Sequence, residues 1–596
     1  MTKSVDEKDS ILSLVKSPYI KNFVKKYKVS YIIGIFFLVL IDYLQTRVPI
    51  IIGNVIDGLE KNNISLSIIA NKLIIIGIIA AFIILGRILW RLFIFGTARK
   101  IERDIRNDLF GHLEKLSQRY FNNHKTGEIM AYITNDLEAV RQAMGQGVLM
   151  TFDVITLLAF TLYNMVTEIN VSLTIAAVIP LLSIALVTSK LGPKLFRKFA
   201  DRQEAFAKIS DFVQENLSGI KVVKAFVQQD KEIEAFEKVN KNYFKENMNL
   251  MKMYAAMHPV MNAIAGMAMA VAIGYGGYIT VKGVISVGDF VAFIQFLGML
   301  VWPMMAIGIA INTITMGSAS LKRIESVLNQ EVEIKDEDNA RQISNFEGSI
   351  RVNNLSYKYP DTDTYVLENM SFEIKKGETL GIVGRTGSGK TTLVNLLLRL
   401  YNVDKNSIFV SGTDIMDIPL KTLRENIGYV PQDNFLFSDS IKNNVDFSDG
   451  SLSIEKVVNA TEFACVHDNI VDFKEGYETV VGERGVTLSG GQKQRVSIAR
   501  ALIKDPEILI LDDSVSAVDT DTEEKILHNL KKQRAGKTNI IIAHRISTIQ
   551  SANHIIVIDE GKIVEQGNHE ELVTNNGLYN SLYQKQLLEK MIDEEV

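Results

Sequence analysis

Six long apolar stretches in the first half of this 596-residue chain constrain its fold more than any other feature. Each is about the ~20 residues that an α-helix needs to cross a bilayer. Helices and closed barrels are the only structures that satisfy all their backbone hydrogen bonds in lipid. The stretches therefore predict an all-α domain of six membrane-spanning helices. They cover residues 29–52, 69–95, 146–166, 171–191, 258–281 and 289–311.

Basic residues between these stretches predict the orientation of the helices. The two long loops, 98–142 and 190–252, are rich in lysine and arginine, whereas the short loops offer only Lys61 and Lys282. Basic loops stay in the cytosol, so both long loops and both termini are expected there. Spans 2 to 5 are expected to continue into the cytosol as a helical stalk. The lysine-containing segment 11–28 predicts an amphipathic helix on the membrane surface.

The pattern changes after a polar, acidic stretch at residues 329–347, which is the predicted linker between a membrane domain, 1–328, and a second domain, 348–596. Beyond the linker, short β-rich runs alternate with helical stretches, which predicts an α/β domain with a parallel sheet. The formal net charge of −4 argues against a nucleic-acid partner. The runs that predict buried strands are residues 379–384, 507–513 and 539–544.

A glycine-rich loop follows the first of these runs. The sequence GRTGSGKT fits the pattern G-x-x-x-x-G-K-[ST], which binds nucleotide phosphates between a strand and a helix. The glycines let backbone N–H groups turn towards the phosphates, and the helix N-terminus favours negative charge. Lys390 is expected to contact the outer phosphates, and the hydroxyl of Thr391 to coordinate Mg²⁺. The residues expected to bind ATP here are Gly384, Arg385, Thr386, Gly387, Ser388, Gly389, Lys390, Thr391 and Thr392.

Two further motifs follow in a fixed order. The hydrophobic strand ILILDD reaches Asp512, and an acid at the end of such a strand is the usual Mg²⁺-holding partner of a phosphate loop. The second motif, LSGGQ at residues 488–492, lies between the phosphate loop and this strand and is followed by KQRVSIARAL. Residues 348–585 therefore resemble the nucleotide-binding domain of ABC transporters.

The resemblance implies roles for several more residues. Tyr359 falls where the family stacks an aromatic ring on adenine, and Gln432 matches the residue that contacts Mg²⁺ and couples to the membrane domain. His544 matches the histidine that contacts the γ-phosphate. The segment Glu483-Arg484-Gly485 resembles an exporter-specific motif, and Ser516-Ala517-Val518-Asp519 lies at the loop where two such domains meet, with Asp519 at the nucleotide.

The LSGGQ motif implies that one chain does not complete a site. In this family two nucleotide-binding domains pair head to tail, and each ATP lies between one phosphate loop and the other subunit's LSGGQ. The hydroxyl and backbone donors of this motif would contact a γ-phosphate presented by the partner. A second ABC half-transporter is therefore the expected partner. The residues concerned are Ser489, Gly490, Gly491 and Gln492.

The membrane half resembles the exporter type of the same family. Segments 120–140 and 215–226 resemble the two cytosolic loops whose short helices press on the nucleotide-binding domains, and Gly288-Asp289-Phe290 precedes the sixth span as in that type. The resemblance implies an ATPase coupled to transport through the cytoplasmic membrane, most similar to bacterial multidrug exporters.

The residue after Asp512 departs from the family. Most members place glutamate there as the general base that polarises the attacking water, whereas this chain has Asp513. Aspartate is one methylene shorter, so its carboxylate retreats by about 1.5 Å. A misplacement near 1 Å costs about 10²-fold in rate, and loss of a general base about 10²–10⁴-fold. This chain's own site is therefore expected to bind ATP and hydrolyse it slowly.

Two interpretations of this departure stay open. In the first, the chain is the weakened half of a heterodimer, and its intact LSGGQ completes the competent site of a different chain. In the second, two copies form a homodimer in which local backbone shifts let Asp513 act as the base. The first is favoured by the resemblance to heterodimeric multidrug exporters.

Charged residues within the apolar stretches are costly and either pair with one another or face a cavity. Pairing between helices is the favoured interpretation, and contact with a polar cargo is the alternative. The residues are Asp42, Arg47, Arg87, Arg91 and Asp153.

Together these features predict ATP-driven export of amphipathic, drug-like molecules, with ATP and Mg²⁺ as cofactors. Two alternatives stay open: a homodimeric exporter of lipids or peptides, and an ATP-binding regulatory subunit of a transporter or channel.

Overall fold

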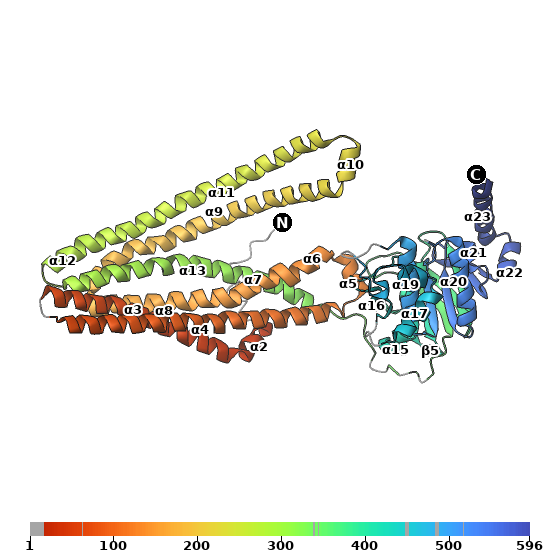
Figure 1. The fold of residues 1–596 in the computed structure, drawn as a ribbon, viewed down its shortest axis with the longest axis horizontal. Coiled ribbons are helices and arrows are strands. Elements are labelled where there is room, and N and C mark those ends of the chain that lie inside the picture. Colours follow the sequence, from red (N-terminus) through yellow and green to blue (C-terminus); the bar gives the residue numbers. More distant parts are fainter. Residues whose placement is uncertain are drawn as a thin grey trace. The chain divides into compact units, whose positions relative to one another are not determined.

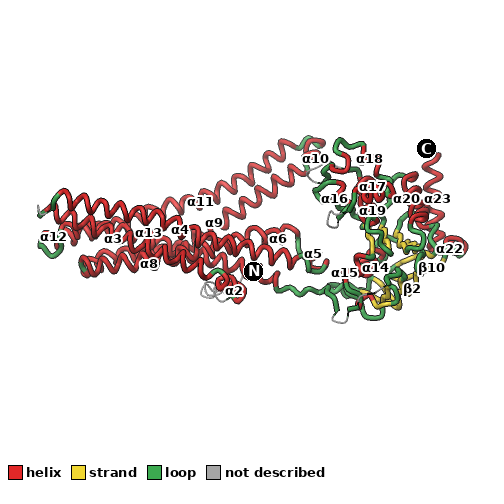
Figure 2. The backbone as a smooth tube through the Cα atoms, turned by 60° about the horizontal axis from the view of Figure 1, so that its bottom comes forward, coloured by secondary structure: helices red, strands yellow, loops and turns green. Residues whose placement is uncertain are grey.

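The computed structural model describes residues 17–61, 64–337, 340–341, 343, 345–447, 452–482, 488–516 and 518–595. The chain forms two compact units. Unit 1 comprises Met1–Glu114 and Lys125–Gln330, and unit 2 comprises Lys115–His124 and Glu331–Val596. The described strands all belong to unit 2, as the yellow segments of Figure 2 show. The short segment 115–124 therefore packs with unit 2, which the sequence-based boundary at 328 does not anticipate.

Unit 1 consists of long helices that lie side by side (Figure 1). Two π-helical turns join α6, α7 and α8 into one helical segment, a third extends α8 to Ile169, and a fourth joins α11 to α12. The helices are α2 (Pro18–Lys26), α3 (Lys28–Glu60), α4 (Leu66–Leu113), α6 (Thr126–Ala131), α7 (Leu137–Gln142), α8 (Val148–Asn164), α9 (Val171–Ser218), α10 (Ile220–Ala225), α11 (Gln229–Val271), α12 (Gly277–Val281) and α13 (Val287–Leu328).

Five helical segments of the described chain are long and apolar enough to cross a membrane: 28–60, 66–113, 126–169, 229–281 and 287–328. The fourth predicted span lies in α9, whose described apolar part is Val171–Ser183. Helices α4 and α9 each have 48 residues, or roughly 70 Å, which is more than twice the ~30 Å bilayer core. The amphipathic helix expected at 11–28 is seen as α2, and residues 11–16 lie outside the described part.

The motif Gly288-Asp289-Phe290 makes the close contact between α3 and α13. A Cβ atom on Gly288 would lie 2.1 Å from the carbonyl oxygen of Gly53, so neither backbone tolerates a side chain there. Asp57 Oδ1 accepts the N–H of Gly288 at 2.6 Å. Asp289 forms a capping box with Ser286, which satisfies N–H groups at the start of the helix.

Several charged side chains of the spans find partners in unit 1. Asp42 is only 3% exposed. It accepts a hydrogen bond from Thr156 and interacts electrostatically with Arg87. Arg47 lies 3.9 Å from Glu168. These contacts agree with the pairing interpretation, because a charge in the membrane interior is stabilised by a partner within the bundle.

Unit 2 is built on two sheets. The larger has the order β10-β9-β3-β8-β7-β6, in which all strands except β10 are parallel to their neighbours. The smaller, with the order β2-β1-β4-β5, is antiparallel and was not predicted. The strands are β1 (Ile350–Tyr357), β2 (Leu367–Ile374), β3 (Thr379–Gly384), β4 (Ile408–Val410), β5 (Thr413–Asp414), β6 (Ile427–Val430), β7 (Ile508–Asp512), β8 (Thr538–Ile542), β9 (His554–Asp559) and β10 (Lys562–Gly567).

The continuous apolar runs of the larger sheet are explained by burial on both faces. In β7, Ile508 and Ile510 belong to one hydrophobic cluster, whereas Leu509 and Leu511 belong to another. The helices of unit 2 are α5 (Gln118–Asn123), α14 (Lys390–Leu397), α15 (Leu420–Glu425), α16 (Ile441–Val445), α17 (Ile454–Phe463), α18 (His467–Val471), α19 (Gly490–Leu502), α20 (Thr520–Gln533), α21 (Ile546–Ile549), α22 (His569–Thr574) and α23 (Leu578–Glu595), with 3₁₀ turns at Ile415–Asp417 and Gly476–Glu478.

Candidate functional site

Four neighbouring parallel strands of the larger sheet end close to the predicted site residues. Strand β3 ends at Gly384, β7 at Asp512, and β8 two residues before His544. Strand β6 ends two residues before Gln432. The carboxyl ends of parallel strands lie along one edge of a sheet, which is where ligands bind in such folds. The sheet order therefore brings these residues from distant parts of the sequence to the same edge.

The phosphate loop is shaped by its glycines and closed by Lys390. Gly387 and Gly389 have φ values of +82° and +100°, a backbone conformation that side chains disfavour. A Cβ atom on Gly384 would lie 2.0 Å from the carbonyl oxygen of Ile558. The Nζ of Lys390 donates to the carbonyls of Gly384 and Arg385, both at 2.9 Å. These contacts hold the loop curled at the start of α14.

The charges of Lys390 and Asp512 at this edge suit an anionic ligand that binds together with a cation. Burial lowers the pKa of Lys390, and attraction to Asp512 and Asp513 opposes that shift. Burial raises the pKa of Asp512, while a hydrogen bond from Thr391 opposes it. Burial thus destabilises the charged form of each group. A polyphosphate near the lysine and a metal ion near the carboxylate would offset this destabilisation.

Two buried oxygen atoms of the site have no hydrogen-bond partner among the described residues: Oδ2 of Asp512 and Oγ of Ser388. A buried acceptor without a partner costs free energy unless a ligand, ion or water satisfies it. Carboxylate and hydroxyl oxygens are also the donors that Mg²⁺ prefers. Asp512 and the adjacent Thr391 hydroxyl therefore fit a magnesium ion, and the exposed side chain of Gln432 lies beyond the neighbouring strand.

Asp513 is held by its backbone in an uncommon conformation. Its φ is +48°, a region in which aspartate is better tolerated than most residues. Its N–H donates to the carbonyl of Ile542 at 2.9 Å, and its carbonyl accepts the hydroxyl of Ser516 at 3.0 Å. Both ends of this peptide segment are thus tied to neighbouring elements.

Tyr359 lies close to the first turn of α14. Its hydroxyl is 3.0 Å from the hydroxyl of Thr392, and its ring lies edge-on to Tyr401 with centroids 5.1 Å apart. The side chain is half-buried, so one part of the ring stays accessible. This placement beside the phosphate loop is compatible with an adenine contact.

The LSGGQ motif starts a different helix. Ser489 caps α19 through a capping box with Gln492, and Leu488 is buried at 5% exposure. Helix α19 packs on α16, α17 and β6, whereas α14 packs on β3 and β7. Within the described part of the chain, no hydrogen bond or ion pair joins the start of α19 to the phosphate loop. Asp519 caps α20 by accepting the N–H of Thr522 at 3.0 Å.

Some predicted residues lie outside the described part, and some contacts were not predicted. Residues 483–487 and Ala517 are outside it. Arg119, Tyr401 and Gln586 were not predicted from the sequence, and they contact the segments carrying Tyr359 or His544. No local sequence signal identifies them, because each acts through a partner distant in the sequence.

Comparisons with known proteins agree with this geometry. The chain matches the families described as "ABC transporter transmembrane region" over residues 31–304 and "ABC transporter" over residues 367–516. It is 37% identical over 566 residues to the "Probable multidrug resistance ABC transporter ATP-binding/permease protein YheI" of Bacillus subtilis, covering 95% of this chain and 97% of that protein.

Two further similarities are relevant. The chain is 36% identical to the "Multidrug resistance-like ATP-binding protein MdlA" of Escherichia coli, with 95% of each chain covered. A solved structure of a bacterial Atm1-family ABC exporter with ATP bound superposes with a TM-score of 0.79 at 26% identity, covering 94% of this chain and 98% of the other. The chain therefore belongs to the ABC transporter family and fuses a helical membrane domain to an ATP-hydrolysing domain that powers transport.

Proposed function

We propose that this protein exports amphipathic, drug-like molecules across the cytoplasmic membrane of a bacterium, as the weakened half of a heterodimer. The observation that carries the proposal is Asp513, the residue that follows Asp512 at the end of β7. A glutamate at this position would reach about 1.5 Å further towards an attacking water. The rest of the ATP site is complete in sequence, so the site binds nucleotide and turns it over slowly.

The backbone at Asp513 supports the heterodimer over the homodimer. For the shorter carboxylate to act as an efficient base, the backbone would have to move towards the nucleotide. The hydrogen bonds from its N–H to Ile542 and from Ser516 to its carbonyl both oppose such a movement. The loss expected from a misplacement near 1 Å, about 10²-fold, therefore stands.

The site residues divide between binding the nucleotide and hydrolysing it. Tyr359 stacks on adenine, and Lys390 together with the N–H groups of the phosphate loop holds the outer phosphates. Asp512, Thr391 and Gln432 would hold Mg²⁺, which supplies positive charge to the phosphate oxygens. Asp513 accepts a proton from water inefficiently, and His544 donates to the γ-phosphate.

The LSGGQ segment serves the partner's ATP. Ser489 is exposed at the N-terminus of the 13-residue helix α19, where backbone N–H groups and the helix dipole favour an anion. Asp519, next to this surface in the family, would contact the partner across the same interface. ATP binding by both chains closes the domains, and this closure shifts the membrane domain between two states that it stabilises differently.

The tip formed by α9, α10 and α11 also favours an assembly with a second chain. Helix α10 joins the ends of α9 and α11 (Figure 1), and the apolar side chains of Val222 in α10 and of Phe226 directly after it are 61% and 71% exposed. Apolar groups exposed together mark an interaction surface. We assign this tip to the nucleotide-binding domain of the partner subunit.

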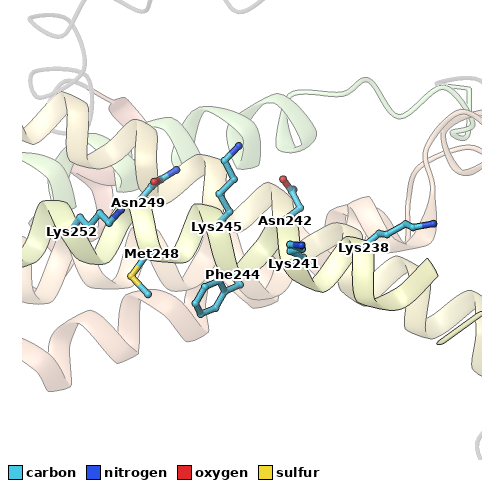
Figure 3. A pocket seen from close by; sticks show the side chains of 8 residues that line it. All are labelled: Lys238, Lys241, Asn242, Phe244, Lys245, Met248, Asn249 and Lys252. Carbon is cyan, nitrogen blue, oxygen red and sulfur yellow. The ribbon is translucent and has the colours of Figure 1, made fainter. Parts of the chain in front are cut away.

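The lysines of α11 support a cytosolic location for the tip and for both termini. A groove of about 490 Å³ runs along this helix, and its basic side chains project from it in Figure 3. They precede the apolar stretch 258–281, which begins in α11, and juxtamembrane lysines favour the cytosolic side. The groove is lined by Lys238, Lys241, Asn242, Phe244, Lys245, Met248, Asn249 and Lys252.

The cargo is assigned from relatives and from the paired charges of the spans. The names of the Bacillus and Escherichia relatives refer to multidrug resistance. Asp42 and Arg47 have partners within unit 1, so a charged cargo is not needed to pair with them. A second candidate is lipid, because the chain is also 35% identical to an "ATP-dependent lipid A-core flippase" of Syntrophus aciditrophicus.

The test is ATP turnover of the chain purified alone in lipid, comparing wild type with Asp513→Glu. We expect wild type to be nearly inactive and the glutamate variant to be at least about tenfold faster, with Lys390→Ala as the inactive control. Brisk turnover by wild type would support the homodimer instead.

A second assay distinguishes cargo classes. Inside-out vesicles containing this chain and its native partner are given ATP with either a fluorescent amphipathic cation or a fluorescent lipid. Uptake of the cation supports drug export, and movement of the lipid alone supports a flippase. Absence of both, with intact ATP binding, supports a regulatory subunit.

A further inference from the structure

The side-chain amide of Gln586 in α23 bridges the turn that follows β8. Its Nε2 donates to the carbonyl of His544 at 2.7 Å, and its Oε1 accepts the N–H of Ile546 at 2.8 Å. The two hydrogen bonds use both ends of one amide. They leave little freedom for the backbone between His544 and Ile546.

The helix that carries Gln586 is anchored to unit 2. Tyr579, at the start of α23, is fully buried, and its hydroxyl is 2.7 Å from Nδ1 of His569. The carboxylate of Glu565 in β10 accepts the N–H groups of Leu578 and Tyr579. The amide of Gln586 is therefore presented from an element that is itself held by packing and hydrogen bonds.

The same turn is also held by α20. Glu523, only 4% exposed, pairs with Arg545 at 3.2 Å and accepts the hydroxyl of Thr548. Ile546 is fully buried. The backbone at His544 is thus fixed between α20 and α23, while the imidazole of His544 is exposed at the edge of the sheet.

Helix capping alone does not account for both bonds. Ile546 is the first residue of α21, whose own N-cap residue Arg545 provides no side-chain acceptor. The bond from Ile546 to Gln586 replaces that missing cap. The bond from Gln586 to the His544 carbonyl contributes nothing to the helix N-terminus, and its effect is to set the position of the His544 backbone.

We propose that Gln586 is a positioning residue for His544, so that the C-terminal helix α23 sets the geometry of the γ-phosphate contact. The inference rests on the proposed role of His544 in ATP hydrolysis. Displacing a catalytic group by about 1 Å lowers turnover by as much as ~10²-fold. Loss of one of several holding bonds is expected to cost about tenfold.

The experiment compares variants of the full chain in lipid, in an Asp513→Glu background that gives the site its strongest turnover. Gln586→Ala removes both hydrogen bonds. Gln586→Glu keeps the acceptor for Ile546 and removes the donor to His544. Gln584→Ala, an exposed glutamine on the same helix, is the matched control.

We expect both Gln586 variants to lower kcat about tenfold while the KM for ATP changes less than about twofold, and Gln584→Ala to behave as the parent. Hydrogen exchange of the peptide 543–550 reports on the hydrogen bonds of Gln586 without requiring ATP turnover. We expect faster exchange in Gln586→Ala only, because only this variant loses the acceptor for the Ile546 N–H. A capping role alone predicts normal turnover for Gln586→Glu, and that result would overturn the proposal, as would unchanged exchange in Gln586→Ala.

The reference variant is His544→Ala. If it lowers kcat while the Gln586 variants do not, the positioning role is wrong and the assignment of His544 stands. If His544→Ala leaves kcat unchanged, the proposed role of His544 fails, and the positioning inference fails with it.

Discussion

Arg119 in α5 forms a two-point ion pair with Asp361, with N···O distances of 2.9 and 2.6 Å. The hydrogen bond from Arg119 holds the pKa of Asp361 below its usual value. Asp361 is two residues from Tyr359, the predicted adenine contact. A second residue of α5 contacts the same region: Asn122 donates to the hydroxyl of Tyr401 at 3.1 Å, and the ring of Tyr401 packs against Tyr359. Helix α5 is therefore tied to the segment that carries Tyr359.

This tie predicts that α5 affects how well the base is held. Arg119→Ala should weaken ATP binding by about two- to fivefold, because the exposed ion pair that steadies the Tyr359 segment is lost. Calorimetric titration would measure the affinity. Tripolyphosphate, which lacks a base, should bind both forms equally. Lys125→Ala removes a lysine six positions further along the chain, which forms no ion pair with Asp361 among the described residues, and serves as the control. Equal weakening by both variants would contradict the prediction.

A second prediction separates the two ATP sites of the proposed heterodimer. In the complex purified with its native partner, Ser489→Ala should abolish most ATP turnover, because the LSGGQ motif completes the partner's competent site. Asp513→Ala should have a much smaller effect, since its own site already contributes little. Turnover of both variants is compared in one preparation.

The control for this experiment addresses helix stability, because Ser489 also caps α19. Loss of an N-cap costs about 1 kcal/mol. Ser489→Thr keeps a hydroxyl cap and should retain most of the turnover. Equal losses from Ser489→Ala and Asp513→Ala would argue against the heterodimer.

A third prediction concerns the buried carboxylate of Asp512. Its pKa is raised in the folded chain, mainly by burial. A raised pKa means that the stabilising contribution of this group is complete below its unfolded pKa of about 3.9 and is lost as the pH rises through the folded value. At neutral pH the ionised group therefore destabilises the nucleotide-free domain, and Asp512→Asn should raise its Tm by roughly 2–4 °C.

Thermal unfolding followed between pH 4 and 8 measures this effect. The gain from Asp512→Asn should shrink towards acid pH, where wild type is protonated as well. Added ATP with Mg²⁺ should raise the Tm of wild type more than that of the variant, because the variant lacks the carboxylate proposed to hold Mg²⁺. A variant that is less stable than wild type at neutral pH would contradict the assignment.

A fourth prediction concerns the contact of α3 with α13. Gly288→Ala places a methyl group against the Gly53 carbonyl, 2.1 Å from its oxygen, and overpacking of this kind costs about 1–3 kcal/mol. The Tm of the protein in lipid should fall. Gly298→Ala, on the same helix with no atom within 4 Å of its added Cβ, should change it little. Similar losses from both variants would indicate a general intolerance of alanine in α13.

Much of this protein could be predicted from local sequence patterns. Apolar stretches of membrane-spanning length predict helices without reference to the rest of the chain, because a segment in lipid satisfies its backbone hydrogen bonds within itself. The phosphate loop, Gly384 to Thr392, is equally local, since its glycines, lysine and hydroxyls act within one turn and the start of one helix. Asp513 was identified by its position after Asp512.

Other features depend on the tertiary structure, because they join residues that no periodicity connects. The ion pair of Arg119 with Asp361 joins residues 242 positions apart, and the hydrogen bond from Gln586 to the His544 carbonyl joins residues 42 positions apart. The antiparallel sheet was missed because its pairing is set by contacts between strands rather than by the residues of one strand.

The sequence alone therefore determined which chemical groups the protein carries and which segments can enter a membrane. The fold decided which of these groups meet. Chain-local propensities act over a few residues, whereas the order of β3, β8, β7 and β6 brings Lys390, His544, Asp512 and Gln432 to one edge. That order is set by burial of apolar side chains on both faces of the sheet, a property of the whole domain.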